Sequence, residues 1–178
     1  GASGDSRDGP TIARISTSSI FRTMVSMKDI DARWIEHALT LADEAGAAGD
    51  VPVGAVLVDE LGEAIGRGIN TREVNADPVG HAEVNALREA GRARGNWNLS
   101  GCTLYVSLEP CTMCAGAIVN ARISRVVFAA WDPKAGAAGS VRDVLRDARL
   151  NHTVEVVGGI AEERANRQLV EWFEARRD

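Results

Sequence analysis

The sequence has 178 residues, of which 45% are hydrophobic and 25% are charged, so it is long enough to bury the core of one globular domain. The formal net charge of −5 argues against a generic nucleic-acid coat protein. No apolar run approaches the roughly 18 residues of a membrane span, so we expect no membrane partner. Two of the three cysteines lie only three residues apart, which favours a reduced, cytoplasmic protein over a disulfide framework.

Residues 1–26 differ in composition from the rest of the chain, because Gly1 to Pro10 is rich in Gly, Ser and Asp. We interpret 1–26 as a disordered extension, a cloning remnant or an over-long start, with Met24 or Met27 as the natural first residue. A targeting peptide also stays open. Residues 27–178 are expected to form a single domain, since no repeat or linker interrupts them.

From Met27 onwards, spacings of three or four between apolar residues predict helices, and short apolar runs bounded by turn residues predict strands. The predicted elements are, in chain order, a helix from Ile30 to Ala45 ended by Gly46, strands at Gly54–Val58 and Ala64–Ile69 joined by the Asp59–Gly62 turn, a helix beginning near His81, a strand at Thr103–Ser107, a helix at Cys111–Ala121, a strand at Arg125–Ala129, a short helix at Val141–Arg146, a strand at Thr153–Val157 and a closing helix from Ala161 to Phe173. Strands that alternate with helices indicate an α/β layered fold with some parallel pairing.

The charge is unevenly distributed along the chain. Residues 1–100 carry 15 acidic and 10 basic side chains, whereas residues 101–178 carry 10 of each. The neutral part holds six basic residues that either form a local basic patch or are simply solvated, namely Arg122, Arg125, Lys134, Arg142, Arg146 and Arg149.

Cys111 and Cys114 form the first motif with chemical meaning. Their i, i+3 spacing at a predicted helix start places both on one face, and Pro110 suits that helix entrance. The positive end of a helix stabilises thiolates, which are the form that binds zinc. Two buried cysteines packed as small apolar residues, or a redox dithiol, are the alternatives for such a pair on its own.

His81 and Glu83 form the second motif, again at a predicted helix start. A lone His is usually a packed or surface side chain, and a first-turn Glu can simply complement the helix dipole. The presence of both motifs favours one shared site over coincidence, because adjacent α/β crossovers can bring two helix starts together.

Catalytic zinc keeps one position open for water, whereas structural zinc has four protein ligands. His81, Cys111 and Cys114 supply three ligands. Cys102 could close the site, but the strand that follows it separates it from the helix start by roughly 16 Å at about 3.3 Å per residue. We therefore expect Cys102 to be a packed core thiol and the fourth position to hold water.

An open zinc site next to a carboxylate that is not a ligand suggests a hydrolysis. Zinc lowers the pKa of bound water to near 7, and Glu83 is suited to take the proton from that water. The same carboxyl group can pass it to a ring nitrogen and later to departing ammonia. This combination predicts hydrolytic deamination of an aminated heterocycle.

The spacing His-x-Glu followed by Pro-Cys-x-x-Cys matches the signature of zinc-dependent deaminases. More specifically, the chain resembles the bacterial tRNA adenosine deaminase family over roughly residues 28–178. The segments that carry the resemblance are Val51–Val56, Asp77-Pro78, His81–Leu87, Leu104–Cys111, Cys114–Ala117, Arg125–Phe128, Asp132-Pro133-Lys134 and Gly136–Ser140.

The resemblance implies a three-layer α/β/α cytidine deaminase-like fold with a five-stranded mixed sheet, one Zn²⁺ per subunit and a homodimer. It also implies conversion of adenosine to inosine at the wobble position of a tRNA anticodon, in an arginine tRNA. Carried over residue by residue, it places Asn70 at the target base and Asp132 at the anticodon backbone. A turn Asn and a surface Asp are the alternatives for these two positions.

Two other functions remain open on the sequence. The zinc motifs alone also fit a deaminase of free guanine or of a cytosine nucleotide, and a non-catalytic zinc module would use the same ligands. The family pattern is not kept at Trp131 or at Val79-Gly80. These differences affect the expected loops and not the residues expected to carry the chemistry. A net charge of −5 also disfavours the binding of negatively charged RNA, unless a dimer brings its basic residues together on one side.

Overall fold

The computed structural model describes residues 25–177, so the expectation for residues 1–26 falls almost wholly outside the described residues. The elements are, in chain order, α2 (Met27–Ala48), β1 (Gly54–Val58), β2 (Ala64–Ile69), α3 (Ala82–Arg94), β3 (Thr103–Leu108), α4 (Thr112–Asn120), β4 (Arg125–Ala130), β5 (Glu155–Gly158) and α5 (Glu162–Glu174). Among residues 25–177, no helix combines the length and apolar character that crossing a membrane requires.

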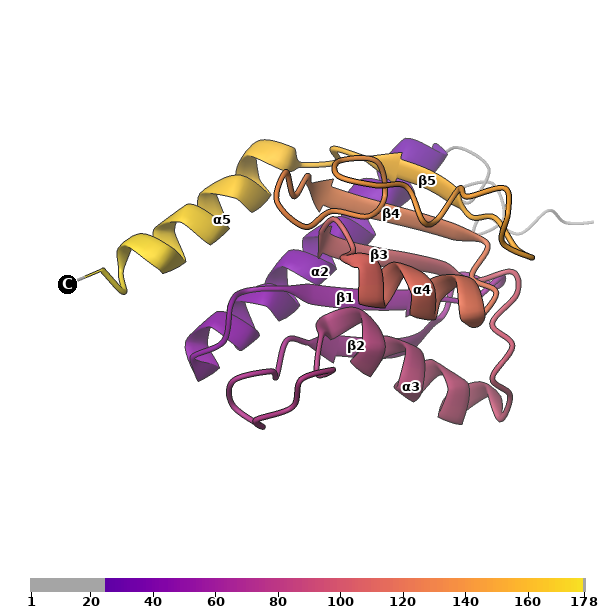
Figure 1. Cartoon of the computed structure of the whole chain (residues 1–178), viewed down its shortest axis with the longest axis horizontal. Helices are drawn as coiled ribbons and strands as arrows, with labels where there is room; N and C mark the ends of the chain where they lie inside the picture. The colour runs from indigo at the N-terminus through magenta and orange to yellow at the C-terminus, as the bar shows by residue number, and fades with distance from the viewer. Residues whose placement is uncertain (1–24, 178) are drawn as a thin grey trace, which may run out of the picture.

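The five strands form one mixed sheet in the order β2-β1-β3-β4-β5 (Figure 1). β1 pairs antiparallel with β2 and with β3, whereas β3, β4 and β5 run parallel. Parallel neighbours need crossover connections, and α4 provides the one between β3 and β4. The predicted α/β class, five strands and mixed pairing are confirmed.

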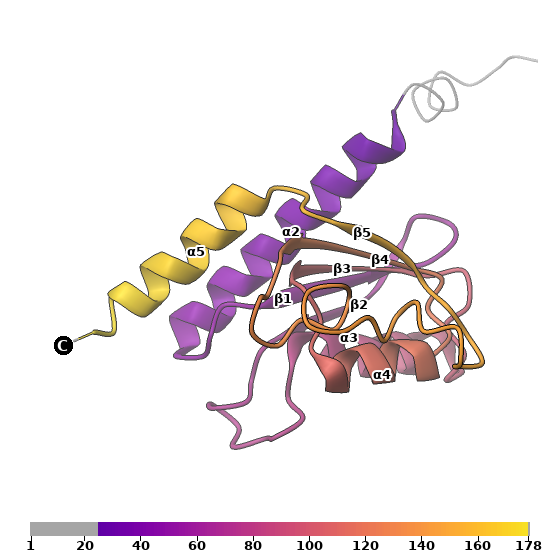
Figure 2. The same ribbon diagram turned by 45° about the horizontal axis from the view of Figure 1, so that its top comes forward.

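Helices cover both faces of the sheet, which gives the expected three layers. Figure 2 shows α2 and α5 side by side on one face and α3 and α4 together on the other. On the α2 and α5 side the buried strand residues include Val56, Tyr105 and Val127. Leu57, Leu104 and Val126 point to the α3 and α4 side. Because alternate residues of each strand enter opposite cores, the strands are apolar on both faces.

α2 extends further than the sequence pattern predicts. Ser26 caps its N-terminus, with its hydroxyl accepting a hydrogen bond from the Asp29 amide at 3.2 Å. Gly46 does not end it but is buried within its last turns, where an added Cβ would lie 3.1 Å from Trp172. Gly49 is the true end, because its φ of 103° lies in the left-handed region that closes helices. The prediction of Gly46 as the terminus was wrong.

A buried ion pair fastens α2 to the sheet. The Asp31 carboxylate, in a residue that is 3% exposed, accepts hydrogen bonds from two Arg125 nitrogens at 2.7 and 2.6 Å. The Tyr105 hydroxyl donates to the same carboxylate at 2.9 Å. Arg125 and Tyr105 lie on β4 and β3, so this cluster joins three elements and leaves its charges paired.

α3 lies unusually close to β2. A Cβ added to Gly68 would come within 2.1 Å of the Ala82 carbonyl oxygen, so no other residue fits there without moving the helix. This close approach fixes the first turn of α3 relative to the sheet edge.

The short helix predicted at Val141–Arg146 does not form. The amides of Val141 and Val144 donate to the carbonyls of Gly136 and Ala137 instead of pairing within a helical turn. A bridge between Ala138 and Asp143 adds to this compact loop. Backbone pairing with the preceding loop therefore replaces helical pairing.

Candidate metal centre and substrate pocket

Two helix starts meet at the carboxyl end of β3. His81 is the residue before α3 and Cys111 the residue before α4, and both have extended backbones with ψ of 153° and 176°. This capping position turns each side chain away from its own helix axis, in front of the first free amides. The positive ends of both helices thereby face one point, which favours anionic ligands there.

The ligand atoms of His81, Cys111 and Cys114 lie within 4.8 Å of one another. Nδ1 of His81 is 3.6 Å from Sγ of Cys111 and 3.5 Å from Sγ of Cys114. A tetrahedral zinc ion at about 2.3 Å from sulfur and about 2.05 Å from nitrogen separates N and S by about 3.6 Å. The three side chains therefore fit zinc without rearrangement, and they are the predicted set.

Cys102 is not part of this cluster. It is fully buried just before β3, at the end of that strand opposite to the metal ligands. Burial raises the pKa of its thiol to about 11. The expectation of a packed core thiol at Cys102 is confirmed.

The two cysteine thiols of the cluster share protons with each other and with His81. A hydrogen bond from Cys114 lowers the pKa of Cys111 to about 4, with a further contribution from His81. The same contact raises the pKa of Cys114, and the bond to Cys111 raises that of His81. A thiolate is thus already favoured at Cys111, and a cation would displace the remaining protons.

Glu83 lies in the first turn of α3, beside the metal cluster but outside it. It is 4% exposed, and this burial raises the pKa of its carboxyl group to about 7. A carboxyl group with such a pKa can both accept and donate a proton at neutral pH. We call His81, Glu83, Cys111 and Cys114 the pocket floor.

Above the pocket floor lies a cavity of about 190 Å³. Its lining brings together five of the six predicted site residues, namely Asn70, His81, Glu83, Cys111 and Asp132; Cys114 lies buried behind Cys111. This volume is below the roughly 300–1,000 Å³ of pockets that enclose drug-sized ligands. It suits a single heteroaromatic base.

Asn70 and Asp132 each also organise a turn. The Asn70 side chain donates to the Val51 carbonyl at 3.2 Å and accepts from the Arg72 amide at 3.1 Å. Oδ1 of Asp132 accepts from the amides of Lys134 and Ala135 at 3.0 and 3.2 Å. Asn70 and Asp132 therefore each stabilise a turn and also line the pocket.

Two loops form the walls of the pocket, and a buried carboxylate holds each. The first wall loop, 70–80, is held by Asp50, which is fully buried and accepts from the amides of Glu73 and Val74 at 2.9 and 3.0 Å. The second wall loop, 132–140, is held by Glu109, which is 2% exposed. Burial would raise the pKa of Glu109, but the hydrogen bonds from Ser140 and the loop amides outweigh it and lower that pKa.

No role was expected for Asp50 or Glu109 from the sequence. The one sequence signal for these two residues is that each is an acid next to a fully buried segment. An acidic side chain that is buried with such a segment needs hydrogen-bond donors around it. Their partners lie at least 23 residues further along the chain, so no local pattern reveals them.

Three of the six basic residues of the C-terminal part form ion pairs. Arg125 pairs with Asp31, Arg146 with Asp143 and Arg149 with Asp147. Their charges are therefore partly neutralised by neighbouring carboxylates.

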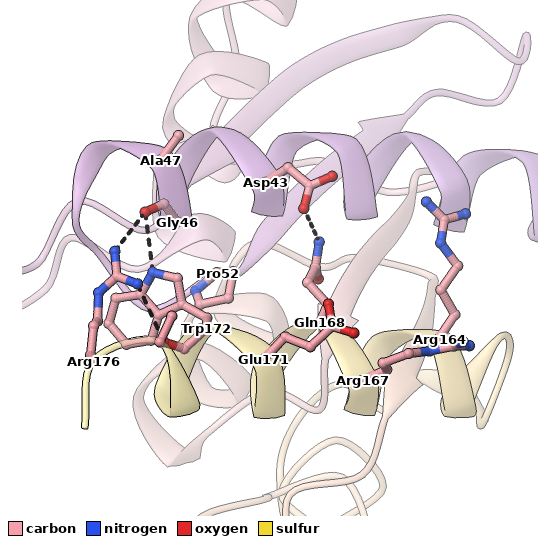
Figure 3. Close-up of a pocket in the computed structure, with 11 residues that line it drawn as sticks. Asp43, Gly46, Ala47, Pro52, Arg164, Arg167, Gln168, Glu171, Trp172 and Arg176 are labelled. Atoms are coloured by element: carbon pink, nitrogen blue, oxygen red, sulfur yellow. Dashed lines mark hydrogen bonds between the residues drawn. The ribbon is translucent and has the colours of Figure 1, made fainter. Parts of the chain in front are cut away.

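A second cavity, of about 630 Å³, lies between α2 and α5 (Figure 3). Trp172 of α5 and Arg176, which follows that helix, both donate to the Gly46 carbonyl, and Arg176 stacks on the Trp172 ring at 3.8 Å. Gln168 reaches across to Asp43 at 2.8 Å. Gly46 also adjoins Pro52, which lies between two lining residues of the first pocket, Val51 and Val53. α5 thus supports that side of the pocket from behind.

The comparisons with known proteins agree with this geometry. The family model of the cytidine and deoxycytidylate deaminase zinc-binding region matches residues 28–130. The tRNA-specific adenosine deaminase of Haemophilus influenzae is 47% identical over 84% of this chain and 87% of its own length. That of Bacillus subtilis is 46% identical over 80% of this chain and 88% of its own length.

A solved structure from studies of A-to-I editing by tRNA:A34 deaminases superposes with a TM-score of 0.71 at 45% identity, over 77% of this chain and 99% of that one. The chain therefore belongs to the cytidine and deoxycytidylate deaminase family and, within it, to the tRNA-specific adenosine deaminases.

Proposed function

We propose that this chain is a zinc-dependent tRNA adenosine deaminase that converts adenosine to inosine at the wobble position of the anticodon and releases ammonia. The observation that carries the proposal is the pocket floor: three ligand atoms at zinc spacing with the buried carboxyl group of Glu83 beside them. The small volume of the cavity favours a substrate of which only the base enters, while the rest of the molecule stays outside. A base flipped out of a single-stranded anticodon loop meets that description.

In this proposal His81, Cys111 and Cys114 hold the zinc ion, which activates a water molecule when it is bound. With the ion bound, the oxygen of that water would add to the amino-bearing carbon. The Glu83 carboxylate would carry one proton of the water to the neighbouring ring nitrogen. It would then carry the second proton to the amine, so that the carbon–nitrogen bond breaks, ammonia leaves and the oxygen stays on the ring as a carbonyl group. Its buried position beside the ligand cluster suits both transfers.

We further propose that Asn70 contacts the target base and that Asp132 helps to hold the anticodon backbone. Each has hydrogen-bonding capacity to spare. An Asn side chain offers two donors and two acceptor positions, of which the turn at Asn70 uses one of each. Among residues 25–177, no donor contacts Oδ2 of Asp132.

Four broader proposals accompany the activity. Residues 27–178 form one deaminase domain, and an arginine tRNA is the substrate. The enzyme works in the cytoplasm, which the three free cysteines support. It works as a homodimer, and the exposed Trp97 beside the groove between α3 and α4 supports a covered surface there. Sedimentation of the zinc-loaded chain at twice 18.9 kDa would establish the dimer.

The decisive experiment incubates the zinc-loaded chain with a transcribed arginine tRNA that carries adenosine at the wobble position. We expect inosine at that position alone, detected by mass spectrometry of nuclease fragments and as an A-to-G change after reverse transcription. The matched control is the same tRNA with guanosine at the wobble position. Absence of inosine from zinc-replete protein would refute the proposal.

The two alternative functions are separated in the same assay. Ammonia release from free guanine or from a cytosine nucleotide, without inosine in the tRNA, would indicate the free-base or nucleotide deaminase. A protein that keeps its zinc but acts on none of these substrates would indicate a non-catalytic zinc module.

A further inference from the structure

Glu109 makes an unusually complete set of hydrogen bonds for a carboxylate next to a metal centre. Oε1 accepts from the Asp132 amide at 2.9 Å and from the Ser140 hydroxyl. Oε2 accepts from the amides of Ala138 and Ser140 at 3.0 and 3.1 Å. All four donors belong to the second wall loop, so one side chain holds both ends of that loop.

The loop lies directly on this carboxylate. A Cβ added to Gly136 would come within 2.3 Å of the Glu109 carboxyl group, so the close contact requires glycine. The same loop is also joined to the metal-binding segment, because the Ala137 amide donates to the Pro110 carbonyl at 2.8 Å and Gly136 bridges to Cys111. Glu109 therefore fixes the loop at the edge of the pocket floor.

The pocket floor and the second wall loop meet different parts of a large substrate. The cavity of about 190 Å³ receives a base, so the rest of an RNA must contact its rim. Asp132 and Ala135, both in the loop, line that cavity, so the loop forms part of its wall. Displacing this loop would disturb the contact surface for the RNA while the ligand atoms stay on α3 and α4.

We propose that Glu109 is a positioning residue for RNA binding: it holds the second wall loop in the conformation that accepts the anticodon, without taking part in proton transfer. This inference rests on the proposed tRNA substrate. Because hydrogen bonds to a buried carboxylate are strong and their loss leaves donors unpaired, a single substitution should release the loop.

The test is Glu109→Gln, which keeps the size of the side chain but points an amide group at N–H donors. RNA binding is measured in a Glu83→Ala background by fluorescence anisotropy with an arginine tRNA anticodon stem-loop. We expect Kd to rise at least ten-fold and KM of the otherwise wild-type enzyme to rise in parallel, with kcat within about three-fold. Zinc content should stay at one per chain, and hydrogen exchange should accelerate in residues 132–140.

Two further variants separate positioning from general stability. Ser140→Ala removes only the hydroxyl contact and should raise Kd about two- to three-fold. Asp31→Asn disturbs another buried carboxylate, on the far side of the sheet, and should lower the melting temperature without changing Kd.

Each contrary result has a definite meaning. Unchanged Kd and unchanged exchange in Glu109→Gln would overturn the proposal. So would zinc loss in step with the binding loss, or an equal rise in Kd in Asp31→Asn, since both indicate a general structural role. Failure of the tRNA substrate itself would look different, because the unsubstituted chain would then neither bind nor deaminate the RNA.

Discussion

The pocket floor and the pocket walls differ in how they are held. The floor consists of side chains at the starts of α3 and α4, each in position because of the helix it precedes or begins. The wall loops 70–80 and 132–140 have no regular structure and depend on Asp50 and Glu109, which reach them from distant segments. The residues of the floor therefore follow from short motifs, whereas the conformation of the wall loops depends on tertiary contacts. Substitutions in the pocket floor and in the pocket walls should therefore have different effects on the protein.

The largest effect is expected in the floor, from Glu83→Ala. Turnover should fall by about 10²–10⁴-fold, because the proton carrier is lost. Zinc content should be unchanged, since Glu83 lies outside the ligand cluster, and Kd for the tRNA should change little. Single-turnover kinetics together with metal analysis would check this. Activity within ten-fold of wild type would show that another group carries the proton.

The second expectation contrasts the floor cysteines with Cys102. After zinc is removed with a chelator, iodoacetamide at pH 8 should label Cys111, whose pKa of about 4 lies well below that pH. Cys102, with a pKa of about 11, has only about one thiolate in a thousand at pH 8 and is fully buried. Peptide mass spectrometry gives the ratio. Equal labelling of the two cysteines in the folded chain would contradict the assignment.

The smallest effect concerns the first wall loop. Asp50→Asn replaces one of two acceptor oxygens with a donor that faces a backbone amide. We expect a loss of about 2–3 kcal/mol in the free energy of unfolding, or about 5–10 °C in Tm, with zinc retained. Asp59→Asn is the matched control, because Oδ1 of Asp59 alone accepts both turn amides and Asn can do the same. If calorimetry showed the same loss of stability for Asp50→Asn and Asp59→Asn, the buried Asp50 would have no special role in holding the first wall loop.

The same contrast explains what could be predicted from the sequence. His81, Glu83, Cys111 and Cys114 were identifiable because the two members of each pair lie within four residues of one another at a predicted helix start, in or next to the first turn. The strands were predictable for a related reason, since each is a short apolar run between turn residues.

Features that depend on distant contacts were not predictable. Gly46 looked like a helix end, but Trp172, which follows it by 126 residues, packs against it and keeps it inside the helix. The segment 141–146 has a helical pattern, yet three of its amides donate to the carbonyls of Gly136 and Ala137. The backbone donors that surround Asp50 and Glu109 lie at least 23 residues away along the chain, so no local pattern reveals them.

The close approach of α3 to β2 has a consequence for attempts to redirect this enzyme by directed evolution. Any side chain at Gly68 would push against the carbonyl of Ala82 and shift the turn that carries Glu83. In a saturation library selected for activity on a new base, position 68 should remain glycine in every survivor. Lining positions such as Val51 and Ala135 touch the cavity without supporting that turn, so variation should accumulate there.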